Sequence, residues 1–314
     1  MIKRMFLNFF QLLKTAVKNF SANDDMKYSA ALSYYTIFSI APMLLLTIVM
    51  GSVFFGQDAL EGHLFDQLEG VIGPEASLFI ENMLQKITLQ QKNFIATVVG
   101  IGTFVFGATR VFGEIQSSIN KIWGLKAKPK KGIISFIFNR FLSFAMIMSI
   151  GFLLIVSLIA SSLISLLNDQ LAQWFSYSAF VMSVISNAVG LAIISVLFTL
   201  IFKLLPDAKI RIKDAFIGSF FTTCLFFIGK YIISMYLATS ATTSAYGAAG
   251  SLIIMLLWVY YSSSILYFGA EFTKAYALHH GHGIEPNKFS IRIATSEYQV
   301  DKKGDPVKKE DLSS

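Results

Sequence analysis

The sequence predicts an all-α, polytopic membrane protein with six transmembrane helices. Hydrophobic residues make up 54% of its 314 residues and charged residues only 14%, whereas about a quarter of the residues of a soluble domain are charged. Several stretches without Asp, Glu, Lys or Arg exceed the roughly 18 apolar residues that a helix needs to cross a bilayer. The only cysteine, Cys224, lies in such a stretch, which excludes an intramolecular disulfide and a cysteine-based metal site.

The N-terminal part predicts a surface helix followed by an interrupted span. Residues 2–20 have apolar side chains at helical spacing and a basic opposite face, which is typical of an amphipathic helix lying in the membrane interface. Span 1 is expected at about 30–55, where Pro42 removes a backbone hydrogen bond near the middle. A kink there would shape a cavity lined by the hydroxyls of the first half; the alternative is a structural proline with these hydroxyls bonded back to their own helix. The hydroxyl-bearing residues are Ser33, Tyr34, Tyr35, Thr36 and Ser39.

Residues 58–92 differ in composition, with six acidic and two basic residues, and they predict two amphipathic helices broken at Gly73-Pro74. We expect them to form an acidic helical cap outside the membrane, between spans 1 and 2. Span 2 follows at about 93–110. Its glycines Gly100 and Gly107 lack the strand-to-helix context of a phosphate loop and indicate helix packing. Residues 111–123 continue the helix with an apolar stripe, which we interpret as an interfacial extension.

Spans 3, 4, 5 and 6 are expected at about 141–166, 178–202, 214–237 and 248–271. Span 6 combines small residues, which allow close approach of helices, with a polar side that lipid would not favour. We therefore expect this span to face other helices or a cavity, with the remaining spans packed around it. The small residues are Gly247, Gly250 and Gly269, and the polar side chains are Tyr260, Tyr261, Ser262, Ser263, Ser264 and Tyr267.

The distribution of basic residues predicts the orientation. The connectors at 110–140 and 203–214 hold seven basic against one acidic and four basic against two acidic residues, while the other three connectors hold two basic residues in total. The positive-inside rule then places both termini in the cytoplasm. The same basic residues, which would contact anionic lipid headgroups, account for much of the net charge of +7. We therefore expect no nucleic acid as a partner. We expect a membrane domain at 1–283 and a disordered cytoplasmic tail at 284–314.

Three motifs are similar to a known family. They are Ala31–Pro42 (ALSYYTIFSIAP), Arg110–Trp123 (RVFGEIQSSINKIW), and Gly247–Lys274, with GAAGS at its start and GAEFTK at its end. Together they resemble the YihY/BrkB-like family over roughly residues 10–280, apart from the charged tail. The resemblance implies a six-span protein of the bacterial inner membrane. The family was once named ribonuclease BN, an assignment now generally rejected, and is often described as a transporter or efflux protein; it implies no catalytic residues.

Ionisable residues near the ends of spans are candidates for function, because charge near lipid is costly. Arg110 and Glu114 end span 2, and Glu271 and Lys274 end span 6, on the same side. We hypothesise that Arg110 pairs with Glu271 and closes the inner mouth of the bundle. The alternative is that all four side chains sit at the water interface and pair within their own helices at the i,i+3 and i,i+4 spacings.

Two further groups of residues are candidates for a binding site. Lys230 lies toward the outer end of span 5, where it would either bind an anionic substrate or reach the interface with its long side chain. His279, His280 and His282 follow span 6; we favour solvated histidines over a metal site, since a stable site needs ligands from more than one segment. No metal or cofactor is expected.

The sequence leaves two classes of function. Catalytic motifs such as HExxH or GxSxG are absent from it, so we expect no enzyme, and a ribonuclease least of all. The first class is a transporter or flippase-like protein for a small, amphipathic or anionic solute or lipid, with Tyr34, Tyr35, Pro42, Lys230 and the polar side of span 6 lining its cavity. The lack of strongly buried charge in the expected spans argues against a proton pump. The second class is a non-transporting scaffold or assembly factor that binds partner proteins or lipid headgroups.

Overall fold

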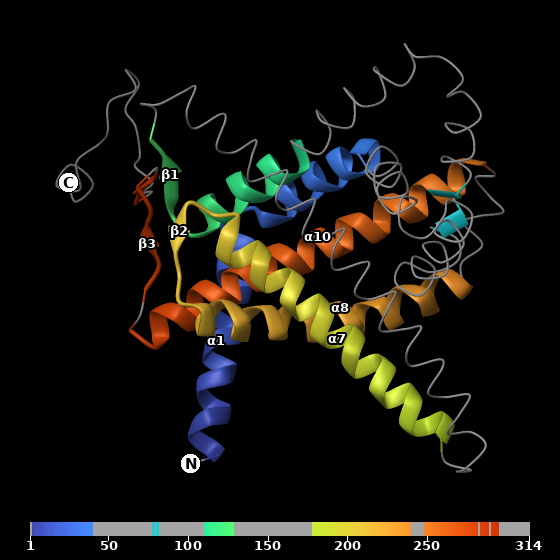
Figure 1. Ribbon diagram of the computed structural model, residues 1–314. Coiled ribbons are helices and arrows are strands. Elements are labelled where there is room, and N and C mark those ends of the chain that lie inside the picture. Colours follow the sequence, from blue (N-terminus) through green and yellow to red (C-terminus); the bar gives the residue numbers. More distant parts are fainter. Residues whose placement is uncertain are drawn as a thin grey trace, which may run out of the picture.

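The structure is a computed structural model that describes residues 2–39, 77–78, 80–81, 110–128, 178–239, 248–281, 283–288 and 290–294. Helices dominate this part of the chain, and the short strands gather at one end of it (Figure 1). Their bounds are α1 Ile2–Ala22, β1 Leu125–Ala127, α7 Ser178–Leu204, β2 Ala208–Lys209, α8 Ile212–Thr239, α10 Ala248–His279, β3 Glu285–Pro286 and β4 Ser290–Arg292. Two further helices occupy residues 25–39 and 110–122.

The three long helices α7, α8 and α10 have the dimensions of membrane spans. They contain 27, 28 and 32 residues, so even α7 is about 40 Å long at 1.5 Å per residue. Their apolar stretches, Asn187–Leu204, Ile212–Ile233 and Leu252–His279, have mean hydropathies of 2.1, 1.7 and 1.7. α8 packs against both α7 and α10, while α1 packs against α10. The positions expected for spans 4, 5 and 6 are confirmed as long apolar helices, although α10 continues beyond residue 271.

A close crossing joins α8 to α10, and small residues make it possible. Gly218 and Thr222 on α8 are four residues apart, as are Gly269 and Thr273 on α10, so each pair lies on one face of its helix. A Cβ atom added at Gly218 would lie 1.8 Å from Thr273 Oγ1, and one added at Gly269 would lie 1.9 Å from Thr222 Oγ1. Each glycine thus receives the threonine of the opposite, antiparallel helix. This confirms the interpretation of Gly269 as a position of close helix approach.

Two short strand pairs tie distant segments together at one end of the bundle. β1 pairs antiparallel with β4, and β2 with β3, so the segments after residue 122 and between α7 and α8 both hold residues from the C-terminal part (Figure 1). The expectation of disorder from residue 284 onward is wrong for the described residues 284–288 and 290–294. Backbone pairing with two basic connectors orders a segment that has few apolar residues of its own.

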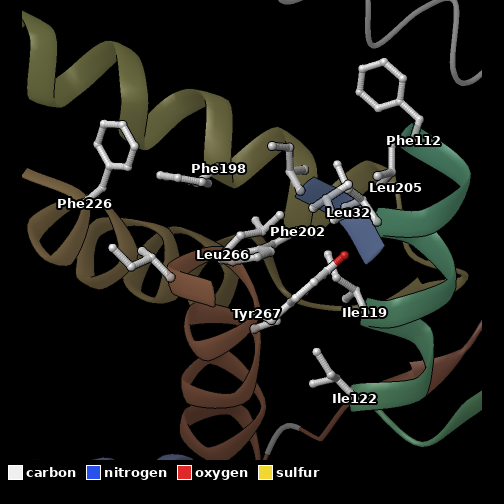
Figure 2. Packing of buried hydrophobic residues seen from close by; sticks show 14 of the residues in the cluster. Leu32, Phe112, Ile119, Ile122, Phe198, Phe202, Leu205, Phe226, Leu266 and Tyr267 are labelled. Atoms are coloured by element: carbon white, nitrogen blue, oxygen red, sulfur yellow. The ribbon is translucent and has the colours of Figure 1, made fainter. Parts of the chain in front are cut away.

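The helix at 110–122 is part of the protein core. Its apolar stripe, consisting of Phe112, Ile115, Ile119 and Ile122 with Trp123, is buried together with residues of α7, α8 and α10. Figure 2 shows Ile119 and Ile122 on the face that this helix turns toward Tyr267 of α10. The expectation of an interfacial extension is therefore wrong: helical periodicity identifies the buried stripe, but a protein surface rather than the membrane interface covers it.

Other expectations fall wholly or largely outside the described residues. These are spans 2 and 3, most of span 1 with Pro42, and most of the acidic cap. Of the cap, residues 77–78 and 80–81 are helical, and Ile80 is fully buried. In Figure 1 this short segment lies toward the beginning of α10, at the opposite end of the bundle from β1.

Candidate functional site

Two carboxylates are buried where the N-terminal helices meet α10. α1 ends at Ala22, and the chain turns through Asn23 and Asp24, whose φ of 59° is in the left-handed region, before the next helix begins at Asp25. Such a conformation is tolerated best by Gly, Asn and Asp. The turn places Asn19, Asn23 and Asp25 against Glu271 of α10. Asp25 and Glu271 both have an exposed fraction of 0%, and we call these four residues with Lys274 the carboxylate site.

Glu271 is held by hydrogen bonds from α1 and the turn. Asn19 Nδ2 donates to Glu271 Oε2 at 3.3 Å, and Asn23 Nδ2 donates to Glu271 Oε1. Each oxygen of this carboxylate therefore has an amide donor, which offsets part of the cost of its burial. These bonds join residues about 250 positions apart in the chain and fix the end of α1 to α10.

Asp25 lacks this compensation. Within the described part of the chain, neither of its carboxylate oxygens has a hydrogen-bond partner, although both are buried. Burial raises the pKa of Asp25 to about 8, and the neighbouring Glu271 carboxylate contributes to this rise, while Lys274 acts in the opposite direction. A carboxyl group in this position accepts a proton near neutral pH.

Lys274 and Trp123 connect the site to the segment that ends the helix at 110–122. The Lys274 ammonium donates to the carbonyl of Ile122, and Trp123 Nε1 donates to the carbonyl of Ala270 at 3.0 Å. Both donors therefore cross between α10 and one neighbouring turn. As a result, the part of α10 that carries Glu271 is held by two segments. One is α1 with its following turn, through Asn19 and Asn23, and the other is the turn after the helix at 110–122.

Tyr267 lies one turn of α10 before Glu271 and is completely buried. Its ring reaches from α10 toward the helix that carries Ile119, with the hydroxyl at the far end (Figure 2). The hydroxyl has no hydrogen-bond partner in the described part of the chain and lies in the electrostatic field of Asp25 and Glu114. Ser118 lies beside it, but donates to Glu114 Oε1 at 3.2 Å.

A second polar network centres on Asp207, in the turn between α7 and α8. Its amide donates to Asn120 Oδ1 at 2.8 Å, and its Oδ2 accepts from Asn120 Nδ2 at 3.0 Å. Asn287 Nδ2 donates to the other carboxylate oxygen at 3.3 Å, and Ser290 Oγ donates to the Asp207 carbonyl. Because each of these donors has an acceptor, we interpret this network as structural: it holds the C-terminal strands on the bundle.

The four residues of the hypothesised gate are only partly brought together. Arg110 is exposed, and the hydrogen bonds that Glu271 accepts come from Asn19 and Asn23. Glu271 and Lys274 also do not sit at the water interface as the alternative required, since Glu271 is buried and Lys274 reaches a backbone carbonyl on another segment. Closure of an inner mouth by Arg110 and Glu271 stays a prediction without support from the described contacts.

The hydroxyls assigned to a cavity lining bond mainly to their own helices. Those of Ser33, Thr36 and Ser39 donate to carbonyls three or four residues earlier, at 2.8 Å each, as in the structural alternative; Ser263 and Ser264 do the same in α10. Tyr261 packs on Gly229 of α8, where an added Cβ would lie 1.3 Å from the Tyr261 hydroxyl. The remaining candidates are distributed as follows: Tyr34 is exposed, Tyr35, Lys230, Tyr260 and Ser262 are half-buried, and Pro42 lies outside the described residues.

The other assigned positions add no site. Gly250 lies in the first turn of α10, whereas Gly100, Gly107 and Gly247 lie outside the described residues. His279 and His280 are exposed at the end of α10, and His282 is not described. In the described ranges, no three His, Cys, Asp or Glu side chains come together as metal ligands.

Sequence reasoning missed Asp25, Asn19 and Asn23. One signal was present: Asp24 and Asp25 are the only acidic residues before residue 58, and they lie just before the long stretch without charged residues that begins after Lys27. The argument against buried charge is corrected as well, because Asp25 and Glu271 are both fully buried.

Comparisons with known proteins agree with the resemblance noted in the sequence. The family model for virulence factor BrkB matches residues 16–290. A UPF0761 membrane protein of Saccharophagus degradans is 29% identical over 261 residues, which cover 83% of this chain and 58% of the relative. A UPF0761 membrane protein of Legionella pneumophila is 26% identical, covering 89% of this chain and 65% of the relative, and one of Haemophilus influenzae is 27% identical, covering 81% and 90%.

The chain thus spans less than two thirds of the length of several relatives. No solved structure matches it. The match to the family model extends from α1 into β4 and includes every residue of the carboxylate site and of the Asp207 network. The chain therefore belongs to the virulence factor BrkB family of membrane proteins.

Proposed function

We propose that this protein is a transporter or flippase-like protein of the bacterial inner membrane, which moves a small, amphipathic or anionic solute or lipid through its helical bundle. The observation that carries the proposal is the carboxylate site. Glu271 lies inside an apolar stretch long enough to cross a membrane, and its neighbour Asp25 is buried without compensating hydrogen bonds in the described chain. Ionisable side chains in such positions are costly in free energy, and their presence marks ion or substrate pathways.

We further propose that both termini lie in the cytoplasm. The two strand pairs and the contact between Asn23 and Glu271 bring together the turn between the N-terminal helices, two basic connectors, and residues 283–288 and 290–294 at one end of the bundle. The excess of Lys and Arg in these segments favours the cytoplasmic side. Labelling of Lys288→Cys by an impermeant thiol reagent, in a chain in which Cys224→Ser removes the native thiol, tests this orientation. Protection in intact cells and labelling after permeabilisation are expected; labelling in intact cells would reverse the assignment.

The second candidate, a scaffold for partner proteins or lipid headgroups, draws support from α1. Leu7, Phe9, Phe10 and Val17 remain exposed on this helix, while Leu12 and Ala16 pack on α10. An apolar surface of this kind belongs in the membrane interface or against another protein. Binding of purified protein to vesicles would accompany either function, so it does not distinguish them.

Reconstitution into liposomes distinguishes the two candidates. We expect vesicles with this protein to exchange a fluorescent lipid between leaflets, or to take up one member of a panel of anionic and amphipathic solutes, faster than vesicles with a heat-unfolded sample. Asp25→Asn is expected to reduce that rate, and Asp24→Asn, on the exposed neighbour, to leave it unchanged. Rates equal to the control across the panel would favour the scaffold. We propose no catalytic activity, cofactor or nucleic-acid partner.

A further inference from the structure

The charges at the carboxylate site do not balance if both carboxyl groups are ionised. Asp25 and Glu271 would carry two negative charges, and Lys274 supplies one positive charge. The exposed ion pair of Lys27 and Asp24, at 2.7 Å, is neutral by itself and lies in the adjoining turn. Two buried carboxylates near one ammonium therefore leave one uncompensated negative charge, which is strongly unfavourable away from water.

The hydrogen bonds distinguish the two carboxyl groups. Glu271 accepts from two amides, which offset part of the cost of burying its ionised form. Asp25 has no donor within the described chain, and the buried hydroxyl of Tyr267, for which those residues likewise provide no hydrogen bond, interacts electrostatically with it. A protonated Asp25 is itself a hydrogen-bond donor, which the ionised carboxylate is not. One proton on Asp25 makes the site neutral, with Glu271 and Lys274 as the remaining pair.

We propose that Asp25 and Glu271 form a binding site for one proton at the junction of α1, the helix at 25–39 and α10. Resting on the transport function proposed above, we assign this proton the role of the coupling ion. Asn23 and Asp24 are exposed beside Asp25, so the site lies one side chain below the surface at that end of the bundle. The proton is exchanged there with the compartment that the N-terminal turn faces.

The other titratable and charged groups near the site come from α10 and from the helix at 110–122. α10 contributes Glu271, Lys274 and Tyr267; the helix at 110–122 contributes Glu114, bonded to Ser118, and Lys121, whose ammonium lies 4.9 Å from the centre of the Tyr28 ring. α1 presents the neutral amide of Asn19, and Asn23 in the turn is likewise neutral. With the pKa of Asp25 raised to about 8 by burial, the proton is exchanged near the pH of a bacterial cytoplasm.

The chemistry of the site favours a proton over a metal cation. Sodium or calcium binds about six oxygen ligands, while the two amides present their N–H groups to Glu271. The described residues also lack a group of three side chains able to hold a metal. A sodium site would therefore require both amides to turn over and both carboxylates to ionise.

Infrared spectroscopy of the purified full-length protein tests the proton site without an assay of transport. A protonated carboxyl group gives a C=O stretching band that disappears on ionisation. We expect a band in the wild-type protein that titrates near pH 8, is absent in Asp25→Asn and is retained in Asp24→Asn. In Lys274→Met, removal of the nearby cation should shift the midpoint upward by about one pH unit, which provides a second test if Asp25→Asn does not fold.

The outcomes separate the two proposals. A titrating band that is the same in the wild type and Asp25→Asn overturns the proton site, as does a band lost on replacing potassium by sodium at constant pH. For coupling, proteoliposomes with a pH gradient should show uptake that depends on the gradient in the wild type and loses this dependence in Asp25→Asn. If Asp25 titrates and the wild type transports nothing, the proton site stands and the transport proposal fails. If transport occurs while Asp25 does not titrate, only the proton site fails.

Discussion

The crossing of α8 and α10 allows a strict test of the packing through Gly269→Ala. In the native arrangement Thr222 lies directly over Gly269, and its hydroxyl donates to the carbonyl of Gly218 at 2.7 Å. The new Cβ atom would lie 1.9 Å from Thr222 Oγ1 and 2.9 Å from both Thr222 Cβ and Cγ2. No rotation about the Thr222 side chain moves its Cβ, so the helices themselves must separate.

The expected effect follows from these distances. Ordinary contact between carbon atoms begins at about 3.5 Å, so the helices must part by roughly 0.6 Å at this point even after Thr222 rotates and gives up its hydrogen bond. The reciprocal contact of Gly218 with Thr273 would open at the same time. Overpacking of this kind costs about 1–3 kcal/mol, against a gain of roughly 0.5–1 kcal/mol for alanine over glycine in a helix. We expect a net loss of about 1–2 kcal/mol in the free energy of unfolding.

Thermal unfolding in detergent measures this loss with a dye that becomes fluorescent on reaction with thiols. Cys224, the only cysteine, lies two residues after Thr222 in α8 and is half-buried, so its reaction with the dye reports the release of α8. Gly190→Ala on α7 is the matched control, because its Cβ would meet only Phe227 Cζ at 3.8 Å, an ordinary contact. We expect Gly269→Ala to melt below the wild type and Gly190→Ala to melt at or above it.

A double variant tests the assigned cause. Thr222→Ala removes the hydroxyl and methyl groups and leaves only a Cβ at 2.9 Å, so combined with Gly269→Ala it should lose less stability than the sum of the single variants. Equal melting temperatures for Gly269→Ala and Gly190→Ala would refute the close crossing. Strict additivity of the two changes at the crossing would show that Thr222 is not what the added methyl group meets.

Three further predictions concern the polar contacts near this crossing and at the same end of the bundle. The free energy of unfolding of the wild type should fall as the pH rises from about 4 to about 8, because folded Asp25 holds its proton more tightly than the unfolded chain; the slope should reach up to about 1.4 kcal/mol per pH unit. Melting curves of Asp25→Asn should show a smaller fall, and parallel pH profiles of the two proteins would contradict this assignment. Trp123→Phe should lower the stability by about 1 kcal/mol, through the lost bond to the Ala270 carbonyl, and an unchanged melting temperature would show that this bond contributes nothing. Asn120→Ala should cost about 1–3 kcal/mol, since it leaves the buried Asp207 amide without its acceptor, and should increase protease cleavage after residue 283; a resistant C-terminal segment would contradict the proposed role of the network.

The sequence was most informative where a single helix decides the outcome. α7, α8 and α10 were predictable because continuous apolar composition over about 18 residues or more leaves few structures other than a buried or membrane-spanning helix. The hydroxyls of Ser33, Thr36 and Ser39 could also be assigned, since a hydroxyl in an apolar helix finds its nearest acceptor three or four residues back. Gly269 was recognised from its size alone.

The carboxylate site could not be derived in the same way. Its bonds join Asn19 and Asn23 to Glu271 across 252 and 248 positions, and no local pattern specifies which helices meet. The same limit explains the error at residues 111–123, where an apolar stripe indicates burial but not whether lipid or protein covers it. It also explains the error after residue 283, because short polar strands become ordered only when another segment offers backbone partners.

By itself, the sequence determined that this chain is a membrane protein, where its last three long helices run, and which connectors carry the basic charge, because composition and length act on each helix separately. Only the tertiary structure decided that Asp25 lies buried beside Glu271, that Gly218 and Gly269 contact opposing threonines, and that residues 285–286 and 290–292 pair with two distant connectors. These features depend on which surfaces come into contact. The free energy of a buried charge or of a close helix crossing depends on the residues that lie near it in space. Residues that are adjacent in the sequence do not show which distant residues these are.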